Sequence, residues 1–355
     1  MTKKTARRLA FMIGAIVALL GAGVVMVFSI GQTASTSELP NPNGYNDLLR
    51  AGQAVAGKIG DFPDLDHSGL RALVATNAEA LRLVRVGLSH RSAVPTDVQI
   101  TNFATISRDL MGLKSLGLLL CAEGRLAEME NHPADAARSY IDAIHLGIEM
   151  SRGGLMMNRL VGIACEGLGS IRLVKLLPQL TCEQIRPVIA ELEKIDENTV
   201  PWREVLQNEN RFARAQLGSY PNPIKLASDL WQARNVRKAS EERHDVAAAH
   251  LRLLTAEVAL RTYRCDQGTG PGTLAELIPR YLQHLPIDPF SGKPLVYRIA
   301  STNWLLYSLG PDRVDNAGIP VGKLMSGDYL ILMGLGASKS GKGQDNGDLL
   351  YDSGW

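Results

Sequence analysis

Aromatic residues and net charge are both scarce in this chain of 355 residues. Phe, Trp and Tyr together make up 5% of it, which leaves few rings on which bases could stack. Lys and Arg number 38 against 36 Asp and Glu, and four of the basic residues, Lys3, Lys4, Arg7 and Arg8, precede the first apolar stretch. The remainder of the chain is therefore slightly acidic, and we expect no binding of nucleic acid.

Cysteines are few and scattered. The four, at Cys121, Cys165, Cys182 and Cys265, form no CxxC pair and have no histidine at ligand spacing, so no zinc site is expected. In an exported domain such cysteines can form disulfides. The spacing predicts buried thiols or at most one bridge, and it leaves the pairing open.

Motifs of catalysis are incomplete. Residues 336–343 fit the GxxxxGK pattern of a phosphate-binding loop, but Gly343 stands where that loop needs Ser or Thr, so no nucleotide is expected. Ser308 lacks the first glycine of the GxSxG nucleophile motif. His244 and His250 are six residues apart, on different faces of a helix, and would not share a metal ion. We therefore expect a protein that is not an enzyme, with no catalytic residue and no organic cofactor.

One long stretch, by contrast, has no charge at all. As a helix, residues 9–30 would extend roughly 33 Å, enough to cross the hydrocarbon core of a membrane. Basic residues lie only on its N-terminal flank, so the positive-inside rule places 1–8 in the cytoplasm and everything after 30 outside. A cleaved signal peptide is the alternative, but its apolar core is shorter, about 7–15 residues. We predict a single-pass, signal-anchored protein of the bacterial cytoplasmic membrane that contacts lipid through 9–30.

Polar and small residues at 31–44 predict a stalk, and the pattern at 45–240 predicts an exported α-helical domain. Apolar residues recur there three and four positions apart, for example at Leu110, Leu113 and Leu116. Proline and glycine interrupt this pattern at intervals, as is typical between the helices of a bundle. The fold class expected for the whole chain is mainly α with a C-terminal α+β part.

Within 117–150, Gly124, Ala136, Tyr140 and Ala143 have the spacing of the small and aromatic positions of a tetratricopeptide helix pair. The segment weakly resembles that family, in which small residues let two antiparallel helices approach closely and an aromatic ring fills the gap between them. A solenoid would need about three copies, whereas the chain has one. The motif therefore favours a single helical hairpin within a bundle.

The pattern changes at 241–355. A helix ending near Tyr263 and a short helix at 274–278 precede several strand-like runs separated by turns. The runs are 294–299, 304–309, 329–333 and 349–351. They predict a small antiparallel sheet packed on one long helix.

Four blocks of this region stand in a familiar order. They are the helix that ends in Tyr263, the DPFSGKP turn at 288–294, the YSLGPD block at 307–312 and a late Gly-Asp-apolar segment at 347–349. Together they resemble the soluble domain of the major pseudopilin of type II secretion, over about a third of the chain. The resemblance implies a small α+β domain built on a long helix.

The loop that follows the YSLGPD block holds candidate ligands for calcium. Calcium requires hard oxygen ligands such as carboxylates, and the resemblance implies a calcium site in this loop. The candidate ligands are Asp312, Asp315, Asp328 and Asp348. Aspartate is also a common turn former, so a purely structural role is left open.

The N-terminus departs from that family. Pseudopilins begin with a Gly-Phe-Thr-Leu-Ile-Glu processing site, whereas the apolar run of this chain has no Glu and a long helical region follows it. Polymerisation into a fibre is therefore not expected. We expect a non-enzymatic interaction or scaffold protein of the bacterial cell envelope, linked to secretion and with protein partners. The alternatives are an atypical pseudopilin of a type II secretion-like system, or an envelope hydrolase whose site is assembled from distant residues.

Overall fold

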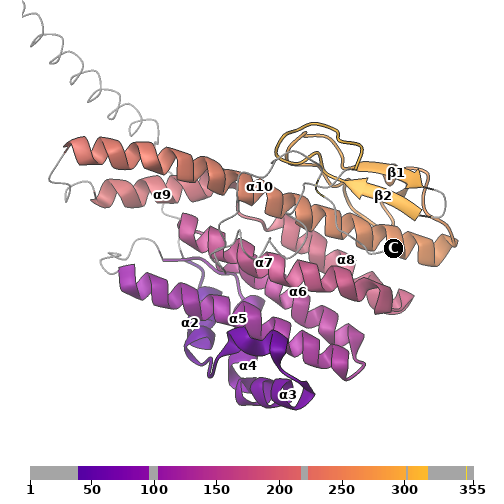
Figure 1. The fold of residues 1–355 in the computed structure, drawn as a ribbon, viewed down its shortest axis with the longest axis horizontal. Coiled ribbons are helices and arrows are strands. Elements are labelled where there is room, and N and C mark those ends of the chain that lie inside the picture. Colours follow the sequence, from indigo (N-terminus) through magenta and orange to yellow (C-terminus); the bar gives the residue numbers. More distant parts are fainter. Residues whose placement is uncertain (1–38, 96–102, 217–222, 301–302, 319–348, 350–355) are drawn as a thin grey trace, which may run out of the picture.

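The computed structural model describes residues 39–95, 103–216, 223–300, 303–318 and 349. Most of them are helical, and one two-stranded antiparallel sheet lies near the C-terminal end of the described chain (Figure 1). The predicted mainly-α fold with a small C-terminal sheet is confirmed at this level. In chain order the elements are α2 (Gly44–Gln53), η1 (Ile59–Asp64), α3 (His67–Thr76), α4 (Ala78–Ser89), α5 (Phe103–Met129), α6 (Pro133–Glu149), α7 (Met156–Leu176), η2 (Leu177–Gln179), α8 (Cys182–Glu197), α9 (Trp202–Gln216), α10 (Pro223–Gln267), η4 (Leu274–Leu277), β1 (Val296–Ala300) and β2 (Asn303–Tyr307).

The described ranges contain no helix that is both long enough and apolar enough to cross a membrane. The predicted anchor at 9–30 and the tail at 1–8 lie outside these ranges, as does the stalk up to residue 38. The membrane anchor therefore stays a prediction from the sequence.

Local sequence decides where the helices begin. The hydroxyl of Thr181 accepts a hydrogen bond from the backbone N–H of Gln184 (3.3 Å), and the Gln184 side chain accepts one from the N–H of Thr181 (3.0 Å). This reciprocal capping box starts α8 at Cys182. α6 starts with Pro133, whose missing N–H is not needed in the first turn of a helix.

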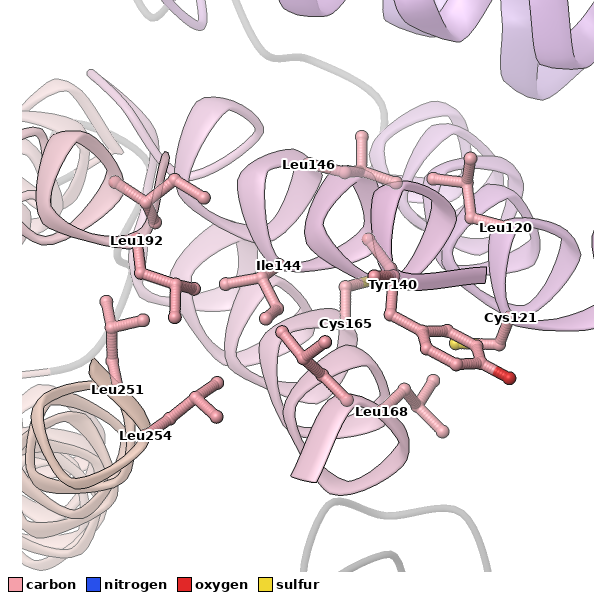
Figure 2. Packing of buried hydrophobic residues seen from close by; sticks show 14 of the residues in the cluster. Leu120, Cys121, Tyr140, Ile144, Leu146, Cys165, Leu168, Leu192, Leu251 and Leu254 are labelled. Atoms are coloured by element: carbon pink, nitrogen blue, oxygen red, sulfur yellow. The ribbon is translucent and has the colours of Figure 1, made fainter. Parts of the chain in front are cut away.

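α5 and α6 form the hairpin that the Gly-Ala-Tyr-Ala motif predicts. Tyr140 of α6 is fully buried against Gly124 of α5, where an added Cβ would lie 2.3 Å from the ring carbon Cε1. The crossing of α6 with α7 is equally close, since a Cβ on Gly162 would lie 2.2 Å from the carbonyl oxygen of Gly147. Figure 2 shows Tyr140 among the buried side chains of this core. Missing side chains at the crossings thus let three successive helices pack closely.

Replacing Gly124 by alanine is expected to lower the free energy of unfolding by about 1–3 kcal/mol, because the new methyl group overlaps the buried Tyr140 ring. Chemical denaturation followed by circular dichroism measures the change. The control is Gly60→Ala, where the added Cβ would meet open space. Equal stability of the two variants would contradict the close packing.

α10 links the helical body to the C-terminal region. It is one continuous helix over Pro223–Gln267, so the domain boundary expected at 240/241 falls inside it. Leu251 and Leu254 of α10 lie toward Leu192 of α8 in Figure 2, and all three belong to a single buried apolar cluster that extends from α2 to the sheet region. The C-terminal part therefore shares its core with the bundle.

The sheet packs on α10. β1 and β2 pair in antiparallel register, as the runs 294–299 and 304–309 predict. The indole N–H of Trp304 donates to Glu257 Oε2 on α10 (2.8 Å), and the guanidinium of Arg264 lies 4.1 Å from a Trp304 ring centroid. The predicted arrangement of a small sheet on a long helix is therefore present in the described residues (Figure 1).

The other two predicted strands are described only in part. Leu349 forms an antiparallel bridge with Ser308, with N···O distances of 3.0 and 2.9 Å. The run at 329–333 lies outside the described residues.

Asp288 fastens the DPFSGKP turn to the YSLGPD block. The residue is 1% exposed, and its carboxylate accepts hydrogen bonds from the N–H of Phe290 (3.1 Å), the hydroxyl of Ser308 (2.8 Å) and the N–H of Leu309 (3.3 Å). One buried carboxylate thus joins the DPFSGKP turn to the YSLGPD block.

The Asp288→Asn variant is expected to be less stable by about 1–3 kcal/mol, because the amide keeps the size of the side chain but loses the charge and an acceptor atom. Thermal unfolding measures the effect. Asp64→Asn, at an exposed position, is the matched control. If both variants melt together with the wild type, the carboxylate does not hold the two blocks.

Candidate functional site

An open groove of about 610 Å³ runs along α4. This helix lies at the edge of the bundle remote from the sheet (Figure 1). α3 and α4 supply most of the lining, and α5 contributes one carboxylate. The residues that line it are Val74, Ala75, Ala78, Leu81, Arg82, Arg85, Val86, Ser89 and Glu123. Apolar side chains thus form most of the wall, and two arginines interrupt them.

The groove exists because α4 has two different faces. Its buried face carries Ala80, Val84 and Gly87, and a Cβ on Gly87 would lie 2.7 Å from the Leu48 side chain of α2. The residues of the face toward the groove follow one another at helical spacing, and most of them are either small or long and polar. Their side chains leave the apolar bottom of the groove uncovered. Ala78 remains exposed at the start of the helix.

Arg85 closes one side of the groove by joining three helices. Its Nε donates to Asp142 Oδ2 of α6 (2.9 Å), and its Nη1 donates to Glu123 Oε1 of α5 (3.1 Å), with Nη2 bonded to the second Glu123 oxygen. The hydroxyl of Ser139 donates to the same carboxylate (2.7 Å). Burial raises the pKa of the Asp142 carboxyl, and the charge of Arg85 opposes that rise. These groups satisfy one another and stabilise the junction of the helices.

Arg82 has a different environment. Its guanidinium donates through Nε and Nη2 to the carboxylate of Glu79, one turn earlier on the same helix, at 2.8 and 2.7 Å. The Arg82 side chain is 60% exposed and the Glu79 side chain is 62% exposed. Exposed pairs of this kind contribute little to stability and exchange partners readily.

No sequence motif marks this groove. The available signal was the pair Arg82 and Arg85 between small and apolar residues of a short amphipathic helix, which is also typical of any solvated face. A groove differs from an ordinary solvated helix face only because α3 and α5 lie beside α4. Tertiary packing sets the positions of these two helices.

A second polar cluster is enclosed between α7, α9 and α10. Arg159 is fully buried, and it bonds Glu166 through both Nη1 and Nη2, the latter at 3.3 Å. Its Nε donates to Nδ1 of His244 (3.0 Å), whose ring lies 5.6 Å from that of Trp202. Burial, together with the charge of Arg159, lowers the pKa of His244 to about 3, so the imidazole is neutral at physiological pH. Through Arg159, His244 and Trp202 the cluster joins α7, α10 and α9.

The predicted calcium ligands are placed only in part. Asp315 accepts the hydroxyl of Tyr307 (2.8 Å) and the N–H of Ala317 (2.9 Å) on Oδ1, and Arg298 Nη2 (2.9 Å) on Oδ2. These bonds, of which the one from Tyr307 is the strongest contributor, lower the pKa of the Asp315 carboxyl.

Asp312 accepts the N–H of Val314 (3.0 Å) and an amide hydrogen of Asn316 (3.2 Å). In the described part of the chain, no three His, Cys, Asp or Glu side chains are grouped so that they could hold a metal ion. The hydrogen bonds of Asp312 and Asp315 within their own loop are those of turn formers, the structural role that the sequence left open. Asp328 and Asp348 lie outside the described residues, so their role as calcium ligands stays a prediction.

The cysteines divide into two classes. Cys182 and Cys265 form a disulfide between α8 and the last turns of α10, and both residues are exposed. Cys121 and Cys165 are buried thiols, and burial raises the pKa of Cys121 to about 12. This agrees with the prediction of buried thiols and at most one bridge.

The remaining sequence candidates are not grouped with the groove. Ser308 is fully buried and donates its hydroxyl to Asp288, which is a structural role. The GxxxxGK segment at 336–343 lies outside the described residues. Comparison of the chain with family models, with curated proteins and with solved structures found no match. Function therefore has to be inferred from the residues themselves.

Proposed function

We propose that this chain is a membrane-anchored, non-enzymatic interaction protein of the bacterial cell envelope, linked to secretion, and that its exported part binds a segment of a partner protein in the α4 groove. The groove is the observation that carries the proposal. It combines an apolar wall with an exposed guanidinium on the rigid face of a helix.

Grooves of this type suit protein segments. Protein interfaces commonly combine an apolar centre with a polar rim, and the lining of this groove has both kinds of residue. A segment that inserts two or three apolar side chains into such a groove gains their burial, and polar contacts at the rim fix its register. The rigid junction held by Arg85 means that little ordering is required of the groove itself.

The proposed location rests on two features. The charge-free stretch at 9–30 follows basic residues, which supports an N-terminus in the cytoplasm. The exposed bridge between Cys182 and Cys265 is a structural disulfide of the type that persists outside the cytoplasm. Protection of a C-terminal tag from protease in spheroplasts would contradict export.

Site-specific photo-crosslinking tests the partner-binding role. A photoreactive amino acid at Val86, in the groove, is expected to yield a crosslinked species of higher mass in living cells. The same amino acid at Gln179, exposed on η2 and absent from the groove lining, is the control. If Val86 gives no crosslink beyond that of Gln179, the groove is not a partner site.

An atypical pseudopilin is the second candidate, and one observation favours it. The DPFSGKP turn and the YSLGPD block meet through Asp288. They belong to a part of the chain in which a sheet packs on a long helix, and the resemblance implies a small α+β domain of that kind. Mass spectrometry of the mature chain separates the two candidates. Cleavage within 1–30 by a prepilin peptidase would favour the pseudopilin, and an intact Met1 would favour the anchored interaction protein.

A further inference from the structure

The two arginines of the groove differ in what they can still bind. All three nitrogens of Arg85 donate to Asp142 or Glu123, and both of these carboxylates are largely covered. Arg82 instead shares an exposed carboxylate with its own helix. A new carboxylate can therefore replace or join Glu79 at Arg82, whereas at Arg85 it would have to break a partly buried network.

The spacing along α4 adds a second requirement. Ala78, Arg82 and Val86 are four residues apart, so they follow one another along one face at intervals of roughly 6 Å. The groove therefore presents an apolar position, a cation and another apolar position in that order. Glu123, the one acidic residue in the lining, is already compensated by Arg85 and Ser139.

We infer that the groove recognises an amphipathic protein segment in which an aspartate or glutamate stands between two apolar residues, with the acid on Arg82 and the apolar residues on Ala78 and Val86. This inference deepens the proposed function and rests on it. A partner helix would satisfy the pattern with apolar, acidic and apolar residues three or four positions apart. A carboxylate is the matching group because a guanidinium binds it through two parallel hydrogen bonds.

Selection of random peptides displayed on phage tests the inference. The immobilised protein is the full-length chain in detergent. Phage that bind an Ala78→Trp variant, whose large side chain fills the groove, are removed first, and the remaining bound phage are eluted with soluble wild-type protein. We expect enriched peptides to contain an acid flanked by apolar residues. Their synthetic versions should bind Arg82→Glu roughly 10- to 100-fold more weakly than the wild type.

A matched control keeps the test specific. Arg138 forms the same kind of exposed pair with Asp135 one turn earlier, on α6 and outside the groove lining, so Arg138→Glu should leave peptide affinity unchanged. Selection on the Arg82→Glu protein should in turn enrich Lys or Arg at the same position. Circular dichroism of each variant verifies that the helices are intact.

Four outcomes would overturn the inference. Peptides that bind the groove without an acid, or that bind Arg82→Glu as tightly as the wild type, would remove the role of Arg82 while leaving the groove as a partner site. Absence of any peptide sensitive to Ala78→Trp would reject peptide recognition, and the Val86 crosslink then decides separately whether the proposed function stands. Self-association of the wild type that Ala78→Trp abolishes would identify the occupant as a second copy of the chain.

Discussion

The Glu166→Ala variant is expected to lose about 3–5 kcal/mol of its free energy of unfolding. Removing this carboxylate leaves the guanidinium of Arg159 fully buried, with the neutral ring of His244 as its remaining partner in the cluster. A buried charge without a counter-charge is strongly destabilising, because neither water nor a carboxylate replaces the lost interaction. Urea denaturation followed by circular dichroism measures the loss.

Two comparisons separate the loss of the charge pair from the loss of packing. The double variant Arg159→Met with Glu166→Leu removes both charges at similar volume, so it should recover most of the lost stability. Glu79→Ala removes an exposed carboxylate that also pairs with an arginine and should have little effect. A Glu166→Ala protein that is as stable as Glu79→Ala would show that Arg159 reaches water.

Periodicity was sufficient to predict the helical body and the positions of the sheet strands. The helix–helix contact at Gly124 and Tyr140 was also predictable, because a glycine and an aromatic residue at that spacing have one simple packing solution. The runs 294–299 and 304–309 are rich in apolar and aromatic residues and are separated by polar residues, and they form β1 and β2 with shifts of one or two residues.

The extent of α10 was not predicted, although the sequence contains the reason for it. The change of pattern at 241–355 suggested a domain boundary at 240/241. After Pro223 no further proline and no glycine occur before Gly268, so nothing stops the helix. The residue composition therefore changes within α10, although the helix itself is continuous.

The buried cluster and the groove depend on distances that a sequence does not contain. Arg159 and Glu166 are two turns apart on one helix and look like solvent-exposed residues, whereas His244 is 85 positions away along the chain from Arg159. The groove at Arg82 requires α3 and α5 to flank α4 without covering it. Both features arise when helices pack, so local patterns do not indicate them.

Loss of the Cys182–Cys265 disulfide is expected to lower stability by about 4.5 kcal/mol, which is the chain-entropy value for a loop of this size. The two cysteines are separated by 83 residues, and the bridge closes a loop that contains α8, α9 and most of α10. Without the bridge, the unfolded chain gains the freedom that this closure removes. The double variant Cys182→Ser with Cys265→Ser, compared with the oxidised wild type in thermal and urea unfolding, measures the difference.

Reduction of the wild type provides the matched control for that variant. Both bridged cysteines are exposed, so dithiothreitol should cleave the bond in the folded protein and lower its melting temperature to that of the double variant. The double variant should not respond to dithiothreitol, because Cys121 and Cys165 are buried thiols with raised pKa values and react slowly.

Labelling of Cys182 or Cys265 by a maleimide in the unreduced wild type would show that the bridge is absent, and the expected stability difference would then vanish. If the bridge is present and its loss changes nothing, the unfolded chain without the bridge already keeps these two segments close together.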